Sequence, residues 1–329
     1  MASLKNHALP RSLIRVKGHS DAAQNFLNKY FTRNIVADLS PTGKHGLFLN
    51  DKGRILSDAI VISGLPRQHE VIYIDCPKEA VEDIHTHLCV YAEYSTYEIE
   101  LLLLESQVFC TKLDATQCIP TSSINNQERQ SILIIQDPRD PMKNTQRLYI
   151  PSEENTSSLC APTYITTKCM SKEEFNDLRY SHGIPEGMGE FCRGSSLPTQ
   201  YNYDYLGGID FTKGCYLGQE LTSRTHFTGV TRRRIVPFLV DRGTTSDVAY
   251  RRHDSSSPPE QIKVFECESE RQVGTLIALQ SSHGLVMHQH IEELSMNVNE
   301  NKFAYCYFNG QLVKLRCYMP FWWPRKHPN

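Results

Sequence analysis

One cysteine of this chain stands in a setting that could do chemistry. The run KGCYLGQE at residues 213–220 places Cys215 between Gly214 and the aromatic Tyr216, where a loop is expected to lead into a short helix. Backbone amides at a helix N-terminus and a nearby lysine such as Lys213 both favour a thiolate. A thiolate is either a nucleophile or a soft ligand for iron, copper or zinc.

A second interpretation of Cys215 is a buried cysteine packed among apolar neighbours, because most cysteines outside disulfides are buried and inert. The neighbouring residues favour an exposed sulfur instead. Gly214 and Gly218 place no side chain around it, which would let another molecule approach closely. Arg224 and the triplet at residues 232–234 bring positive charge nearby in sequence.

A single sulfur cannot hold a metal centre alone, because zinc and iron–sulfur clusters usually take four protein ligands. No C-x-x-C pair occurs, and His226, eleven residues beyond Cys215, is too distant in sequence for a local ligand pair. A metal at Cys215 would therefore take its remaining ligands from a partner or a small thiol. Gln219 and Glu220 either orient that partner or are solvated and cap the helix, and the sequence leaves both interpretations open.

Composition excludes several classes of protein. The chain has 329 residues, enough for two or three domains, and a formal net charge of −2, which gives no reason to expect nucleic acid or an anionic membrane as a partner. No apolar run approaches the roughly 20 residues that span a bilayer. Eleven scattered cysteines indicate a reducing compartment rather than a disulfide framework.

The first acidic residue is Asp21, so the basic start fits either the tail of a mitochondrial presequence or an exposed first strand at residues 12–16.

Other polar clusters are weaker candidates. The segment 137–141 is a proline-fixed turn in which Arg139 is expected to pair with one of its two flanking aspartates. The arginine triplet at 232–234 predicts a solvated strand start rather than a nucleic-acid patch. His288 and His290 are expected to face the same way on an alternating strand, but a metal site there lacks a third ligand.

The spacing of apolar and turn residues predicts an α+β protein with a change of texture near residues 235–240. In the first part we expect helices after Asp21, from Pro77 to Tyr91 and from Ser171 to Gly183. The strands of this part include a hairpin around residues 50–53. The last part predicts a small β-barrel or sandwich of short strands at 235–240, 262–267, 273–279, 285–290, 303–308 and 312–318.

The order of several motifs resembles the YgfZ/GcvT family. These are GIPEG at 183–187, Glu190, Leu197-Pro198, KGCYLGQELTSRTH at 213–226 and Gly229-Val230, with further matches in LNDKGRILSD at 49–58, DPR at 137–139 and WWP at 322–324. The resemblance covers almost the whole chain. KGCY-x-GQE is highly specific, whereas the other motifs are individually weak. Within the family the chain looks closest to the mitochondrial iron–sulfur cluster assembly branch.

The resemblance implies an aminomethyltransferase-like fold. Two intertwined lobes of the folate-binding type would occupy residues 1–236, and a β-barrel residues 237–329. It also implies a non-enzymatic role in the mitochondrial matrix, in late maturation of [4Fe-4S] proteins with A-type carrier proteins. Cys215 would ligate a [2Fe-2S] cluster shared with a carrier, with glutathione or a glutaredoxin-type protein as a further thiol donor. The surface that docks the carrier would comprise Lys213, Gly214, Tyr216, Gly218, Gln219, Glu220 and Arg224.

One departure from the family concerns folate. Relatives commonly carry a glutamate after LPL, and in the folate-using members it grips the pterin, whereas this chain has Gln200. Glutamine can still donate and accept, but it loses the charge-assisted hydrogen bond. A tetrahydrofolate-dependent aminomethyl or one-carbon transferase is therefore the alternative function. A thiol-redox protein that forms mixed disulfides through Cys215 is a third.

Overall fold

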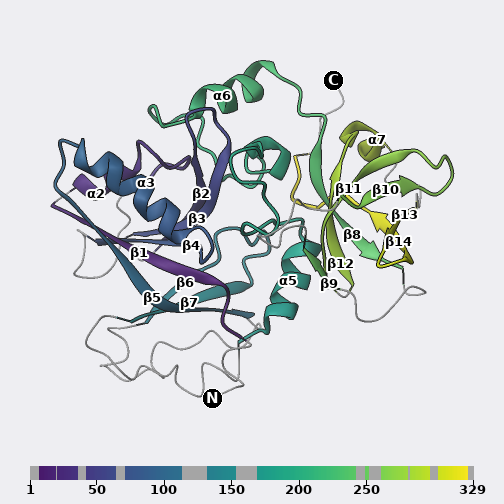
Figure 1. The fold of residues 1–329 in the computed structure, drawn as a ribbon, viewed down its shortest axis with the longest axis horizontal. Coiled ribbons are helices and arrows are strands. Elements are labelled where there is room, and N and C mark those ends of the chain that lie inside the picture. The colour runs from purple at the N-terminus through teal and green to yellow at the C-terminus, as the bar shows by residue number, and fades with distance from the viewer. Residues whose placement is uncertain are drawn as a thin grey trace. The chain divides into compact units, whose positions relative to one another are not determined.

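The computed structural model describes residues 7–19, 21–35, 42–63, 71–112, 132–152, 169–241, 249–251, 261–280, 282–296 and 303–324 (Figure 1). The chain divides into two compact units. The first unit comprises Met1–Lys172 and Gly207–Gln219, and the second comprises Glu173–Leu206 and Glu220–Asn329. The Cys215 loop therefore belongs to the first unit, although the second unit supplies the chain on both sides of it.

The first unit is built on a seven-stranded sheet in the order β2-β3-β4-β1-β5-β7-β6, with antiparallel neighbours throughout. The hairpin predicted around residues 50–53 is confirmed, since this turn joins β2 to β3. The strand β7 was not predicted. The strands are β1 (Arg11–Gly18), β2 (Thr42–Leu49), β3 (Ile55–Ser63), β4 (Val71–Pro77), β5 (Ile99–Lys112), β6 (Leu133–Gln136) and β7 (Thr145–Ser152).

Two helices, α2 (Ala22–Leu27) and α3 (Val81–Glu93), pack on this sheet and complete its core (Figure 1). Phe26 of α2 and Leu88 of α3 are fully buried against apolar side chains of the strands. The helix expected to open at Pro77 starts later, because Pro77 is the last residue of β4 and pairs with Arg11 of β1.

A buried ionic network crosses the same sheet. Arg11 donates to Asp75 at 2.6 Å, and Arg147 donates to both Asp75 at 3.0 Å and Asp137 at 2.7 Å. Arg139 also donates to Asp137, at 3.1 Å, which confirms the pairing predicted for the turn. Burial alone would raise the pKa of Asp137, but Arg139 and Arg147 outweigh it and hold that pKa well below its usual range. Asp137 therefore remains charged inside the sheet.

The second unit contains a closed β-barrel. Its strands follow the order β10-β13-β14-β8-β12-β11-β9, and β10 also pairs with β11, so six strands close on themselves and β9 extends from β11. The sequence left a barrel or a sandwich open, and the barrel is found. The strands are β8 (Arg234–Val240), β9 (Ala249–Arg251), β10 (Lys263–Glu266), β11 (Gln272–Gln280), β12 (His283–His288), β13 (Ala304–Phe308) and β14 (Gln311–Cys317).

The other described helices are α5 (Lys172–Ser181), the 3-10 helix η3 (Pro198–Tyr201), α6 (Gln219–Thr228) and α7 (Ile291–Met296). They belong to the second unit except for Lys172 and Gln219, the first residues of α5 and α6. The helix predicted to end at Gly183 is confirmed, since Gly183 follows α5 with φ +69°. Among the described residues no helix is long and apolar enough to cross a membrane.

One prediction at the end of a barrel strand is wrong, and another holds only in part. The strand expected to include both histidines ends at His288, which is buried, whereas His290 is exposed and its backbone N–H donates to His288 Nδ1 at 3.2 Å. Burial lowers the pKa of His288 to about 4. Of the arginine triplet, Arg232 and Arg233 are exposed as predicted, whereas Arg234 is buried at the start of β8 and pairs with Asp204 at 2.7 Å. The buried arginine can be tolerated because its charge is neutralised there.

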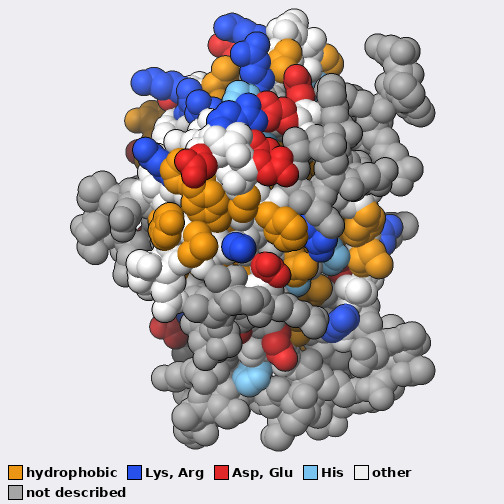
Figure 2. Space-filling view, turned by 90° about the vertical axis from the view of Figure 1, so that its right-hand side faces the viewer, with side chains coloured by type: hydrophobic (Ala, Val, Ile, Leu, Met, Phe, Trp, Pro, Cys, Tyr) orange, Lys and Arg blue, Asp and Glu red, His pale blue; other side chains and the backbone are white. Residues whose placement is uncertain are grey.

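Apolar side chains also lie on the outside of the barrel. Figure 2 shows hydrophobic side chains gathered on the face at the right-hand side of Figure 1, where β10, β13 and β14 are labelled. Tyr305 stacks on Phe265 with ring centroids 5.6 Å apart, and Tyr307 of β13 is 61% exposed. Scattered exposed apolar residues are normal, so this face by itself does not identify a site.

Candidate functional site: the Cys215 loop

The loop at residues 213–219 is fixed by hydrogen bonds to a segment nearly two hundred residues earlier in the chain. Lys213 Nζ donates to the carbonyl oxygens of Phe31 at 2.7 Å and Arg33 at 3.2 Å. The Leu217 N–H donates to the carbonyl oxygen of Lys29 at 2.8 Å. These three bonds hold both sides of Cys215 against residues 29–33.

Gly218 anchors the other side of the loop on the β2–β3 turn. Its φ is +79°, and a Cβ added there would lie 2.3 Å from the carbonyl oxygen of Asn50 and 3.0 Å from the Cα of Gly53. Glycine is thus required by close backbone packing within the first unit. Gly214 differs, because a Cβ there would meet nothing within 4 Å. Of the two glycines, Gly214 leaves open space beside the cysteine.

Lys213 and Tyr216 form the interior of the loop. Lys213 is half-buried, and this burial lowers its pKa to about 8, although Asp210 acts in the opposite direction. Its Nζ lies 5.2 Å from the centroid of the Tyr216 ring. Tyr216 is 7% exposed, and burial raises its pKa to about 12. The Tyr216 N–H donates to Gln219 Oε1 at 3.3 Å, so Gln219 closes the loop at the start of α6.

Cys215 itself is exposed, so the interpretation as a buried cysteine is wrong. The setting expected for it also needs correction. The helix α6 begins at Gln219, four residues after the cysteine, and the Lys213 ammonium is bound by backbone carbonyls. The sulfur is therefore presented by an anchored loop rather than by the first turn of a helix.

Glu220 and Arg224 lie one turn apart on α6 and are largely solvated. Their side chains are 92% and 72% exposed, with a closest N–O distance of 4.0 Å. Such a pair contributes little to stability, which leaves both charges available to a partner. Gln200 lies in η3 of the second unit and is half-buried.

A cluster at Cys215 would need ligands from outside the described residues. Within those residues no group of three histidine, cysteine, aspartate or glutamate side chains could hold a metal ion. Cys76, Cys110 and Cys306 are buried, and Cys89 is half-buried. In the described part of the chain, Cys267 is the other exposed cysteine.

The sequence did not predict the residues that hold the loop. The carbonyl groups of Phe31 and Arg33 bind Lys213 through their backbone, so their residue types carry no signal. The β2–β3 turn was predicted as a hairpin, but its contact with Gly218 joins segments far apart in sequence. Only the glycine in the motif could have indicated a close backbone contact.

Comparison with solved structures shows the fold. The crystal structure of the glycine cleavage system aminomethyltransferase T from Bartonella henselae superposes with a TM-score of 0.63, over 98% of this chain and 88% of that chain, at 13% sequence identity. The predicted aminomethyltransferase-like fold is thereby confirmed. At this identity the likeness carries no information on activity.

Sequence relatives are more specific. The mitochondrial "Iron-sulfur cluster assembly factor IBA57 homolog" of Dictyostelium discoideum is 31% identical over 287 residues, covering 78% of this chain and 68% of the relative. The mouse "Iron-sulfur cluster assembly factor IBA57" is 30% identical over 242 residues, which cover 70% of this chain and 64% of the mouse protein. Its human counterpart is 29% identical over 237 residues, which cover 69% of this chain and 64% of the human protein. The chain spans only about half the length of some relatives, for example 53% of the relative from Yarrowia lipolytica.

No protein-family profile matches the chain. The predicted resemblance and its mitochondrial assignment are confirmed by the Dictyostelium, mouse and human relatives, whose names each include "mitochondrial". The chain belongs to the IBA57 family of mitochondrial iron–sulfur cluster assembly factors.

Proposed function

We propose that this protein is a non-enzymatic assembly factor of the mitochondrial matrix that acts late in the maturation of [4Fe-4S] proteins. Cys215 would supply one thiolate ligand to a [2Fe-2S] cluster whose other ligands belong to an A-type carrier, with glutathione or a glutaredoxin-type protein as a further thiol source. The cluster is the cargo of this reaction. The family of the chain supports the cluster chemistry, and the exposed Cys215 is the observation that carries the assignment of the ligand.

The loop suits a shared ligand in two respects. Its sulfur is exposed, so a second protein can reach it. Lys213, Leu217 and Gly218 fix the backbone on both sides, so little conformational entropy is lost when the sulfur binds. A soft thiolate is also the ligand that iron–sulfur clusters use.

Reconstitution with an A-type carrier, iron and sulfide tests the proposal. The wild-type chain should form a complex with the carrier and develop cluster absorbance in the visible range. Cys215→Ser should lose at least nine-tenths of the absorbance attributable to the mixed complex. Cys267→Ser is the matched control, since it removes the other exposed cysteine of the described residues and should leave the absorbance unchanged. Equal absorbance and equal complex formation for Cys215→Ser would remove this residue from the role.

The alternative function is a tetrahydrofolate-dependent aminomethyl or one-carbon transferase. The observation in its favour is the order of motifs such as GIPEG at 183–187 and KGCYLGQE at 213–220, which resembles a family that includes folate-using members. Titration calorimetry with tetrahydrofolate discriminates between the two. Tight binding together with one-carbon turnover would favour the transferase, whereas Gln200 in place of the family's glutamate leads us to expect neither.

A further inference from the structure

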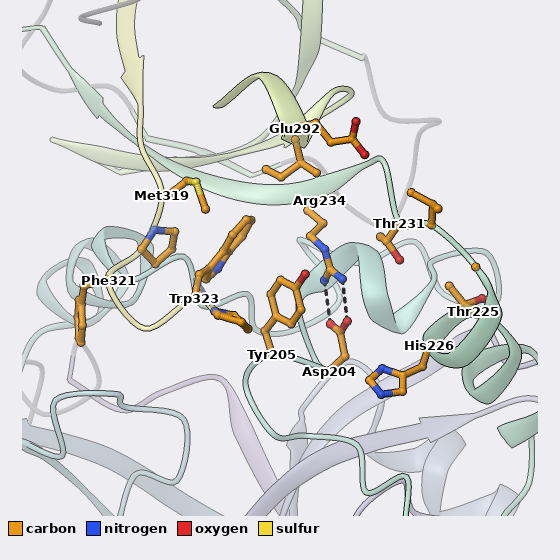
Figure 3. A pocket seen from close by; sticks show the side chains of 15 residues that line it. Asp204, Tyr205, Thr225, His226, Thr231, Arg234, Glu292, Met319, Phe321 and Trp323 are labelled. Atoms are coloured by element: carbon orange, nitrogen blue, oxygen red, sulfur yellow. Dashed lines mark hydrogen bonds and ion pairs between the residues drawn. The ribbon is translucent and has the colours of Figure 1, made fainter. Parts of the chain in front are cut away.

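The second unit contains a pocket of about 870 Å³ that the proposed cluster chemistry does not use. One wall comes from the C-terminal part of α6 and residues 229–231, and the opposite wall from residues 319–324 (Figure 3). Asp204, Tyr205 and Arg234 lie between these walls, and Glu292 of α7 lies at the rim. All these residues belong to one unit, so the pocket is formed within it.

The two charged groups at the centre of the pocket are paired with each other. Arg234 makes two hydrogen bonds to the carboxylate of Asp204, at 2.8 and 2.7 Å, which Figure 3 marks with dashed lines. The guanidinium carbon lies 3.8 Å from the centroid of the Tyr205 ring, and Trp323 meets that ring edge-on with centroids 5.5 Å apart. These groups form a preorganised aromatic surface rather than a site that needs a charged ligand to neutralise it.

Large apolar side chains are exposed around this surface. Val230 is 69% exposed and Phe321 62%, one on each wall, and Tyr205 between them is 37% exposed. Phe227 at the end of α6 is a further exposed aromatic residue, at 68%. Apolar side chains that gather at a concave site with an aromatic centre are typical of a protein-binding surface.

The charges at the rim favour an acidic partner. Arg232 and Arg233 directly follow the wall residues 229–231 and are both exposed, and Arg224 on α6 is 72% exposed. On the acidic side, Glu220 lies 4.0 Å from Arg224, and Glu292 is exposed at the rim, while Asp204 is neutralised by Arg234. The neighbouring exposed Glu293 is paired with Arg271, so Arg232 and Arg233 outnumber Glu292 once the ion pairs are set aside. Carboxylates on a partner would be complementary to these two arginines.

We propose that this pocket docks a segment of a partner protein that inserts one bulky apolar side chain over Tyr205, between the walls that carry Val230 and Phe321, and carries carboxylates on either side of it. The carboxylates meet the exposed arginines at the rim. The inference does not depend on Cys215 as a cluster ligand, because every residue that carries it lies in the second unit.

Selection from a random dodecapeptide library displayed on phage tests this proposal with the full chain as the immobilised target. The variant Val230→Ser/Phe321→Ser removes both exposed walls, and Tyr307→Ser is the matched control, since Tyr307 is 61% exposed on the outside of the barrel and does not line the pocket. Far-ultraviolet circular dichroism checks that both variants fold. Binding of the selected peptides is measured by the fluorescence of the tryptophans, of which the chain has two, including Trp323 in the pocket.

We expect enriched peptides that place an aromatic or long aliphatic residue among aspartates and glutamates. Their Kd should rise at least tenfold on the double variant and less than twofold on Tyr307→Ser. No enrichment, a basic consensus, or peptides that bind the double variant equally well would overturn the proposal. Sedimentation showing a dimer of this chain that Phe321→Ser dissociates would also overturn it, because the occupant would then be a second copy.

Discussion

The two glycines that flank Cys215 have different roles, and this difference can be measured. Gly218 has a positive φ and backbone neighbours at 2.3 and 3.0 Å from an added Cβ, whereas Gly214 has open space. Gly218→Ala should therefore lower the free energy of unfolding by about 1–3 kcal/mol, the typical cost of strained backbone. Gly214→Ala should change it by less than about 0.5 kcal/mol. Urea denaturation of both variants checks this, and equal effects would show that the loop is not packed on the β2–β3 turn.

Lys213 gives the loop a predictable pH dependence. Its pKa in the folded protein is about 8, below its ordinary value of 10.5, because burial disfavours the charged form. Between these two values the unfolded chain binds a proton that the folded chain has lost, so the contribution of Lys213 to the free energy of unfolding rises with pH. Below pH 8 the lysine is protonated in both states and the cost of burying its charge is fully present.

The substitution Lys213→Met removes this titration. The advantage of the wild type over Lys213→Met, measured by urea denaturation, should be larger at pH 9.5 than at pH 7.5. Lys52 is an exposed lysine of the β2–β3 turn, and Lys52→Met is the matched control for the loss of a lysine. An advantage that shrinks as the pH rises would mean that the lysine is not buried as the geometry indicates.

At the scale of elements, the strands of the first unit are joined by the buried charges of Asp75, Arg11 and Arg147. Removing one partner of a buried pair typically costs about 3–5 kcal/mol, because the other charge stays buried without its counter-charge. Asp75→Asn should therefore destabilise the protein by about that amount. The control is Glu100→Gln, which breaks the pair with Arg15 at 3.3 Å, where Glu100 is 57% exposed. Its effect should be below about 1 kcal/mol.

Thermal unfolding monitored by circular dichroism distinguishes these two variants. A melting temperature for Asp75→Asn as high as that of Glu100→Gln would show that the network does not hold the sheet together. The result matters for the site, because β2 and β3 of the same sheet carry the turn on which Gly218 packs.

Local sequence patterns predicted elements better than their boundaries. The hairpin around residues 50–53 and most barrel strands followed from alternation and turn residues. The start of the helix at Pro77 was predicted too early. A proline is tolerated both in the first turn of a helix and at the end of a strand, so its type alone does not distinguish the two. Pairing of Pro77 with Arg11 of β1 places it in the strand. The strand predicted to reach His290 was too long, because β12 ends at His288 and α7 already begins at Ile291.

At the scale of the whole molecule, what the sequence could not predict is non-local. The barrel closes through the pairing of β10 with β11, and the first unit takes in Gly207–Gln219 from between two parts of the second. The motif around Cys215 was recognisable from its residues, but the contacts of Lys213 with Phe31 and Arg33 join positions about 180 residues apart. The predicted boundary between residues 236 and 237 stays a prediction, as do the roles of the motif residues in docking a carrier.

The most direct test of the shared cluster is the protection of Cys215 from alkylation. Iodoacetamide labelling, followed by mass spectrometry of the Cys215 and Cys267 peptides, is performed on the protein alone, on the complex reconstituted with an A-type carrier, iron and sulfide, and on that complex after the cluster is removed by a chelator. We predict that Cys215 is labelled in the protein alone, protected at least tenfold in the cluster-bearing complex and labelled again after chelation, while Cys267 is labelled throughout. A cluster-bearing complex in which Cys215 is labelled as fast as in the protein alone would contradict its role as a ligand.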